Sequence, residues 1–161
     1  MLLVVGNCRV PVNFKFAMLG RNQQTEVQDA TIKFPPGVTM PSIAIIGASN
    51  NRAKYGNKAL RAYMQRGDTV YAINPIHREA EGMNTYASVL DVPGDIDVAT
   101  FYVPPEIGLR VIEEVARKGI RQVLLNPGAE SEALLKRAEE LGIQATVACS
   151  ILLAGRSPAE F

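Results

Sequence analysis

The sequence has 161 residues, enough for one domain with a substantial buried core. Its hydrophobic fraction of 47% and charged fraction of 20% are ordinary for a globular protein, and its apolar runs fall short of the roughly 18 residues that a membrane span needs. The 17 basic and 16 acidic residues give a formal net charge of +1, so the electrostatic signature of a nucleic-acid binder is missing.

Residues 1–39 lack the alternation of strand-length apolar runs and helical patterns that the remaining chain shows. The stretch RNQQTEVQDATIKFPPGV, residues 21–38, is polar and then reads Pro-Pro-Gly, without a useful helical or strand period. Two interpretations stay open: an accessory strand and loop packed on a sheet, or a flexible or non-native extension with Met40 as the original start. We therefore divide the chain into an extension (1–39), a main domain (40–155) and a tail (156–161).

From Ser42 onward, apolar runs of strand length alternate with helical patterns. The predicted strands cover residues 43–46, 69–73, 98–103, 122–125 and 143–147. The predicted helices cover residues 57–66, 105–118 and 130–141, with one further turn around 86–90. This alternation is typical of βαβ units. It predicts an α/β, Rossmann-like three-layer fold with a five-stranded parallel sheet.

Parallel strands deliver their carboxyl ends to one edge of the sheet, where open α/β sheets bind ligands. The five predicted ends are Gly47-Ala48-Ser49, Asn74-Pro75, Pro104-Pro105, Asn126-Pro127-Gly128 and Cys149-Ser150. None of them carries Asp or Glu. Small residues and prolines shape a backbone surface without supplying acid–base chemistry, so this edge suits a binding crevice better than a catalytic one.

The first strand end has the features of an anion site. Gly47 permits a tight turn, Ser49 offers a hydroxyl, and the following loop runs into a predicted helix N-terminus, where backbone N–H groups and the helix dipole favour an anion. Arg52 and Lys54 would add charge-assisted contacts to phosphate. The alternative is that Gly47 only turns the chain and the two cations are solvated loop charges.

A dinucleotide fingerprint G-x-G-x-x-G would need three glycines, but Gly47 to Arg52 reads GASNNR, so only the first is present. An NAD site would also need an acidic residue after the second strand to bind the ribose hydroxyls. Asn74-Pro75 stand there, followed by His77 and Arg78. A strand end without an acidic residue and followed by possible cations tolerates a phosphorylated ribose better than an unphosphorylated one. This argues against NAD as the ligand.

His77 and Cys149 are the remaining candidates for chemistry. His77 is the single histidine; it either contacts a ligand phosphate or is a solvated loop residue, and we favour the second. Cys149 is either a nucleophile or a small buried apolar residue, and we again favour the second, because nothing in the sequence supplies an activating base. Cys8 and Cys149 lack metal-site spacing and fit a reducing cytoplasm. We expect no catalytic residue and no metal site.

Five segments, in order, resemble the small stand-alone CoA-binding proteins, which are similar to the N-terminal domain of the succinyl-CoA synthetase alpha subunit. The segments are IAIIGASNNRAKYGNKALRAY, VYAINP, ATFYVPPEIG, LLNPGAES and ACSI. The resemblance covers about residues 40–155. It implies a Rossmann-like fold that binds CoA, or an acyl-CoA, as its small-molecule ligand.

The resemblance also implies a role for each strand end. The CoA pyrophosphate would lie in a cradle formed by Gly47, Ala48 and Ser49. The same loop would be lined by Asn50, Arg52 and Lys54. The adenosine would be bordered by Asn74 and Pro75. The nucleotide would be flanked across the crevice by Tyr102, Val103 and Pro104. The pantetheine path would pass near Asn126, Pro127 and Gly128.

The chain departs from the synthetase in lacking the domain with the phosphorylated histidine, and His77 does not match that residue. We therefore expect CoA binding without ligase chemistry, with a homo-oligomer or a protein partner as open possibilities and no nucleic-acid or membrane partner. Two rivals stay open: an NAD(P)-dependent or thioester-handling enzyme using Cys149, and a protein–protein interaction module whose nucleotide crevice is vestigial.

Overall fold

The computed structural model describes residues 2–5, 8–11 and 41–161. Strands β1 (Leu2–Val5) and β2 (Cys8–Pro11) pair in antiparallel fashion as a two-stranded sheet, separate from the main sheet. The rest of the predicted extension 1–39 lies outside the described residues, so both interpretations of that extension remain predictions.

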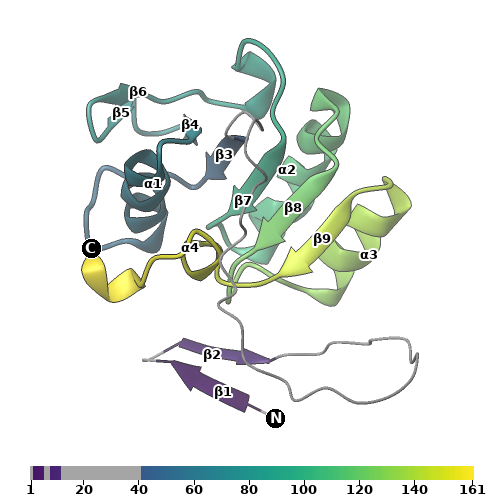
Figure 1. The fold of residues 1–161 in the computed structure, drawn as a ribbon. Coiled ribbons are helices and arrows are strands. Elements are labelled where there is room, and N and C mark those ends of the chain that lie inside the picture. Colours follow the sequence, from purple (N-terminus) through teal and green to yellow (C-terminus); the bar gives the residue numbers. More distant parts are fainter. Residues whose placement is uncertain (1, 6–7, 12–40) are drawn as a thin grey trace.

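The main sheet has five strands, all parallel, in the order β4-β3-β7-β8-β9 (Figure 1). Their bounds are β3 (Ser42–Ile46), β4 (Thr69–Ile73), β7 (Val98–Phe101), β8 (Gln122–Leu125) and β9 (Gln144–Val147). The helices are α1 (Tyr55–Arg66), α2 (Pro105–Lys118), α3 (Glu132–Glu140) and α4 (Ser150–Leu153). The predicted α/β fold with a five-stranded parallel sheet is confirmed.

Several short elements escaped prediction from the sequence. They are the hairpin of β5 (Glu79–Ala80) and β6 (Met83–Asn84), helix α4, and the 3-10 turn η2 (Pro158–Glu160). The helical turn predicted around 86–90 is present as the 3-10 turn η1 (Val89–Asp91). Two to four residues are too few to show a period of 2 or 3.6. The structure also starts α1 two residues earlier than predicted and ends β7 two residues earlier.

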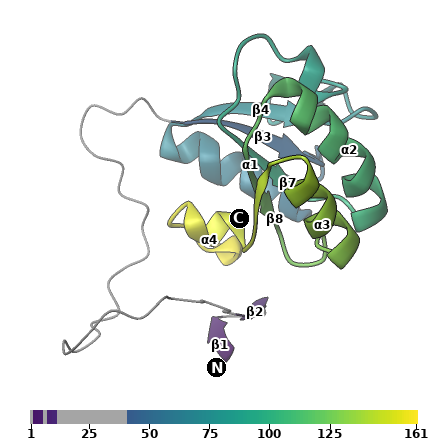
Figure 2. The ribbon, with the colours of Figure 1, turned by 90° about the vertical axis from the view of Figure 1, so that its right-hand side faces the viewer.

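Alternate residues of the strands bury two separate apolar layers, one on each face of the sheet. On one face Phe101 packs with Ile112 of α2 and Leu134 of α3; on the other, Ile45 packs with Leu60 of α1 and Ile151 of α4. All six side chains in this arrangement are fully buried. Figures 1 and 2 show α2 and α3 on one side of the sheet and α1 and α4 on the other.

The sheet register brings the last residue of every strand into one row. Ile46 is paired with Ile73 on one side and with Phe101 on the other, Phe101 with Leu125, and Leu125 with Val147. The chain therefore leaves all five strands at the same level, and the loops that follow them share one edge of the sheet.

Two glycines let three backbone segments meet at this edge. Gly47 has φ of 90°, and a Cβ on it would lie 2.7 Å from the carbonyl oxygen of Tyr102. A Cβ on Gly56, in the first turn of α1, would lie 2.2 Å from the carbonyl oxygen of Gly47. Any side chain at either position would therefore push the end of β3 away from β7 or α1.

A buried amide connects the ends of β7, β8 and β9. Asn126 Nδ2 donates to Thr100 Oγ1 at 2.7 Å and to the Phe101 carbonyl at 3.0 Å, while its Oδ1 accepts from the Ser150 backbone N–H at 2.8 Å. These bonds satisfy both ends of the amide, as burial requires. Asn126 thus fixes the chain where it leaves the sheet.

A buried tyrosine, Tyr63, and a partly buried one, Tyr102, continue this polar network to Ser150. Tyr63 Oη donates to the Ser150 carbonyl at 2.9 Å, and Tyr102 Oη lies 2.6 Å from Ser150 Oγ. Burial raises the pKa of Tyr63 to about 12, although the bond to Ser150 acts in the opposite direction. Burial raises the pKa of Tyr102 further. Both phenols are therefore neutral hydrogen-bonding groups at neutral pH.

We predict that Gly56→Ala destabilises the fold. Overpacking against a backbone oxygen costs about 1–3 kcal/mol, which exceeds the roughly 1 kcal/mol that alanine gains over glycine in a helix. Gly108→Ala in α2 is the matched control, because its Cβ would meet the movable Leu134 Cδ2 at 2.8 Å. Urea unfolding should show a clear loss of free energy for Gly56→Ala and a smaller change for Gly108→Ala; equal effects would contradict the tight crossing.

We also predict that stability falls as pH rises above the ordinary tyrosine pKa. Tyr63 ionises near pH 10 when unfolded but has a pKa of about 12 when folded. Between these values the unfolded chain releases the proton first, so unfolding becomes easier by on the order of 2 kcal/mol. Urea unfolding at pH 8 and about pH 11 measures this loss. Tyr63→Phe should reduce the pH dependence, whereas the change Tyr55→Phe, at an exposed tyrosine, should leave it intact.

Candidate functional site

The loop after β3 is ordered by its own side chains. Ser49 is 3% exposed, and its Oγ accepts from the Asn51 backbone N–H at 3.1 Å. Asn51 Oδ1 in turn accepts from the Ala53 N–H at 3.0 Å. These short-range bonds are typical of Asx and Ser turns. They hold the loop in a fixed path from the sheet to the helix.

Helix α1 begins at the end of this loop without a side-chain cap. Lys54 stands at the N-cap position, no side chain bonds to the first turn, and that turn carries no acidic residue. The exposed Lys54 therefore lies beside the positive end of a 12-residue helix. Backbone N–H groups, the helix dipole and a lysine at one place favour an anion.

A carboxylate missed by the sequence analysis lies against the same loop. Glu81, in the turn between β5 and β6, accepts from Asn57 Nδ2 at 2.9 Å and forms an ion pair with Arg52, Nε to Oε1, at 3.2 Å. Asn57 is fully buried and also donates to the Ser49 carbonyl at 2.7 Å. The sequence pattern does not reveal Glu81, because the strands of its hairpin are too short to show a period.

Asn74, at the end of β4, acts on the first loop rather than presenting its amide to the crevice. Its Nδ2 donates to the Ala48 carbonyl at 2.6 Å, and its Oδ1 accepts from the N–H groups of Ile76 at 2.8 Å and His77 at 3.1 Å. Pro75 and Ile76 remain exposed beyond it, Ile76 to 82%. This corner therefore offers a rigid backbone and an apolar surface.

The ends of β7 and β8 have the same character. The Tyr102 hydroxyl and the Asn126 amide point into the buried network, and Val103 is half-buried. Pro104, Pro127 and Gly128 are exposed. The predicted site residues thus fall into two groups: one that fixes the backbone from below, and one that forms the surface of the edge.

Cys149 and His77 take no part in a recognisable catalytic arrangement. Cys149 is 5% exposed and belongs to the apolar layer beneath α1 and α4. His77 is half-buried, and its carbonyl accepts a bond from the Thr85 hydroxyl. Within residues 41–161 no group of three or more His, Cys, Asp or Glu is placed to hold a metal ion. None of the helices in the described part of the chain is long and apolar enough to cross a membrane.

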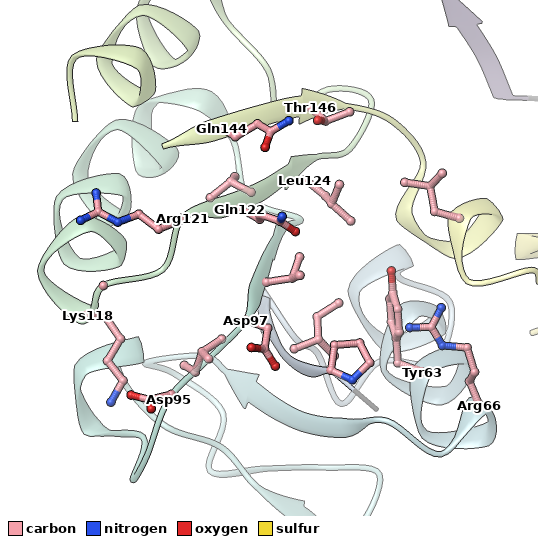
Figure 3. Close-up of a pocket in the computed structure, with 17 residues that line it drawn as sticks. Tyr63, Arg66, Asp95, Asp97, Lys118, Arg121, Gln122, Leu124, Gln144 and Thr146 are labelled. Atoms are coloured by element: carbon pink, nitrogen blue, oxygen red, sulfur yellow. The ribbon is translucent and has the colours of Figure 1, made fainter. Parts of the chain in front are cut away.

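A hollow of about 890 Å³ lies elsewhere, toward the beginnings of the strands (Figure 3). Gln122, Leu124, Gln144 and Thr146 of β8 and β9 line it. None of the predicted site residues does. This hollow and the row of strand ends are therefore different places, and the anion-binding features belong to the strand ends.

Known structures resemble this arrangement over most of its length. A conserved hypothetical protein from Pyrococcus furiosus superposes with a TM-score of 0.66 and 37% identity, covering 70% of this chain and 98% of that one. The dinucleotide-forming acetyl-coenzyme A synthetase 1 of Ca. Korarchaeum cryptofilum, in complex with phosphate and ADP, gives a TM-score of 0.59 and 32% identity over 66% of this chain, but only 25% of the synthetase.

Curated relatives include ADP-forming acetate–CoA ligases from two archaea. Identity is 34% over 97 residues with ligase I of Archaeoglobus fulgidus and 37% over 91 residues with the ligase of Methanocaldococcus jannaschii. The matches cover 60% and 56% of this chain, and only 14% and 13% of the two ligases.

The family model described as "CoA binding domain" matches residues 41–156. This span contains all five parallel strands and every loop that follows them. The chain therefore belongs to the CoA-binding domain family.

Proposed function

We propose that the chain binds CoA or an acyl-CoA along the edge formed by the strand ends, without catalysing a reaction by itself. One observation carries the proposal: in a member of this family, the uncapped N-terminus of α1 and the exposed Lys54 meet at the end of β3. That arrangement suits the pyrophosphate of CoA.

The phosphate end of the ligand would lie over the first loop. Gly47, Ala48 and Ser49 would cradle the pyrophosphate. Because the N–H groups of Gly47 and Ala48 already donate to the Ile73 carbonyl, these two residues would shape the turn. The Ser49 side chain is buried, so its backbone N–H would face the phosphate. Lys54 would supply a charge-assisted contact. Arg52 lines the same loop, but its Nε is already engaged by Glu81.

The rest of the ligand would follow the exposed rims of the other strand ends. Pro75 and the neighbouring Ile76 offer apolar contact for the adenosine, and Tyr102 to Pro104 would flank it on the opposite side. The pantetheine would pass Pro127 and Gly128. Asn74 and Asn126 support this path by fixing backbone, because their amides are already hydrogen-bonded inside the protein.

The absence of catalysis in this proposal rests on two observations. The matches cover only 13–14% of the curated ligases, so ligase activity is not carried over to this chain. Cys149, the candidate for thioester chemistry, is buried in an apolar layer. An NAD(P)-dependent enzyme and an interaction module are kept as outcomes of the test below.

We predict that calorimetric titration with CoA gives a dissociation constant near the micromolar range, about −8 kcal/mol, and that NAD⁺ and NADP⁺ bind much more weakly. Lys54→Ala should weaken CoA binding about three- to tenfold, because a partly solvated charge contact is lost. The control is Lys136→Ala, an exposed lysine in α3 that removes the same charge far from the strand ends.

Each alternative gives a different pattern in this titration. Stoichiometric binding of NAD⁺ or NADP⁺ in place of CoA would favour an enzyme. No detectable binding of CoA, NAD⁺ or NADP⁺ would overturn the CoA proposal and favour an interaction module. Equal loss in the Lys54 and Lys136 variants would leave CoA binding standing but remove the first loop from the site.

A further inference from the structure

We propose that Glu81 sets the charge selectivity of this site: its carboxylate neutralises Arg52 and opposes an anion on the first loop, so that of the two cations on that loop Lys54 supplies the effective positive charge. The inference rests on the proposed CoA site and identifies a residue that limits its affinity. It predicts that removing the Glu81 charge strengthens binding of a phosphorylated ligand.

The contacts of Glu81 place its charge within the loop. One oxygen, Oε1, lies 3.2 Å from Arg52 Nε and 2.9 Å from Asn57 Nδ2. The Glu81 side chain is 19% exposed, whereas that of Arg52 is 68% exposed. Because the carboxylate is largely shielded from water, its field is screened less than that of a surface acid.

Turn geometry alone does not explain a glutamate at this position. Glu81 has φ of 49° and Gly82 has φ of 77°, the left-handed pair of a two-residue hairpin turn between β5 and β6. Such turns favour Asn-Gly or Asp-Gly, and a longer side chain in this conformation is strained. The bonds to Arg52 and Asn57 offset that strain, so the carboxylate is held where it faces the loop.

Arg61 holds the partners of Glu81 in place from the other side. Its Nε donates to Asn57 Oδ1 at 2.8 Å, and its terminal nitrogen donates to the Arg52 carbonyl at 3.0 Å. Arg52 is therefore tied by its backbone to α1 and by its side chain to Glu81. A ligand phosphate that approaches Arg52 is also repelled by the Glu81 carboxylate, so the net attraction is smaller than the charge of Arg52 alone would give.

Lys54 is in the opposite situation. It is exposed and, within residues 41–161, takes part in none of the ion pairs. Counting formal charges on the loop and on the side chains bonded to it, Arg52, Lys54 and Arg61 contribute three positive charges and Glu81 one negative charge. The carboxylate thus lowers the net charge presented to a phosphate from about three to about two, and the site attracts anions less strongly than its cations alone would.

The test compares Glu81→Gln with Glu79→Gln. Glutamine keeps an oxygen to accept from Arg52 and Asn57 but removes the charge; Glu79 is an exposed acid on the same hairpin and provides the matched loss of charge. Titration with CoA at low salt should show binding about three- to tenfold tighter for Glu81→Gln and within about twofold of wild type for Glu79→Gln. The difference should shrink in about 0.5 M NaCl.

A double variant separates charge from folding. Arg52→Ala combined with Glu81→Gln removes one charge of each sign, so its affinity should return to within about twofold of wild type. Circular dichroism melting of each variant checks that the fold persists.

The outcomes distinguish this inference from the proposed function. If wild type binds CoA and Glu81→Gln binds no tighter than Glu79→Gln, the role of Glu81 is wrong while CoA binding stands. If neither wild type nor Glu81→Gln binds CoA, the proposed function is wrong and the inference is overturned with it. Binding seen only in Glu81→Gln would overturn the proposed function for the wild-type chain while supporting the role of Glu81.

Discussion

Backbone contact among Gly47, Gly56 and Tyr102 sets the geometry of the edge where the proposed ligand lies. With no Cβ at either glycine, the end of β3 approaches both α1 and the end of β7 more closely than a side chain would allow. In a dinucleotide fingerprint the third glycine serves the same close packing of helix on strand. Here Gly56, in the first turn of α1 and after a longer loop, serves it. That longer loop gives room for Arg52 and Lys54 before the helix begins.

Three buried or half-buried asparagines convert this close packing into a fixed surface. Asn57 connects the first loop to the β5–β6 turn, Asn74 connects it to β4, and Asn126 connects β7, β8 and Ser150. Amides achieve this without adding charge. Carboxylates at the same buried positions would add charge and would cost desolvation free energy. The strand ends are thereby held in place while their exposed parts stay neutral and small. A surface of this kind is preorganised for binding but holds no acid–base group aimed at a ligand.

The sequence predicted the repeating parts of this fold and missed the parts that depend on contacts distant along the chain. Strands and helices with a clear period were predicted within one or two residues at most ends, because regularly spaced burial produces a periodic pattern of apolar residues in the sequence. Gly56 showed no such pattern: its role depends on an oxygen nine residues away along the chain, at Gly47. Glu81 was missed because it lies in the two-residue turn of a hairpin whose strands have only two residues each. The direction of the Asn74, Tyr102 and Asn126 side chains also could not be read, since each points to a partner on another strand end.

The location of anion chemistry in this protein follows unpaired charge rather than the size of a hollow. The hollow beside β8 and β9 contains three cations and two acids. Arg66 is paired with Asp68 at 2.7 Å and Lys118 Nζ donates to the Val92 carbonyl at 2.5 Å. Arg121 shares the hollow with Asp95 and Asp97, whose negative charges oppose an anion. Its floor is formed by neutral polar side chains, such as Gln122, which let this part of a parallel sheet meet water without an apolar cover. At the strand ends, an uncapped helix N-terminus and Lys54 remain without a neutralising partner among the described residues. A phosphate is attracted by uncompensated positive charge and by helix N-terminal N–H groups, so this edge is the better site for it.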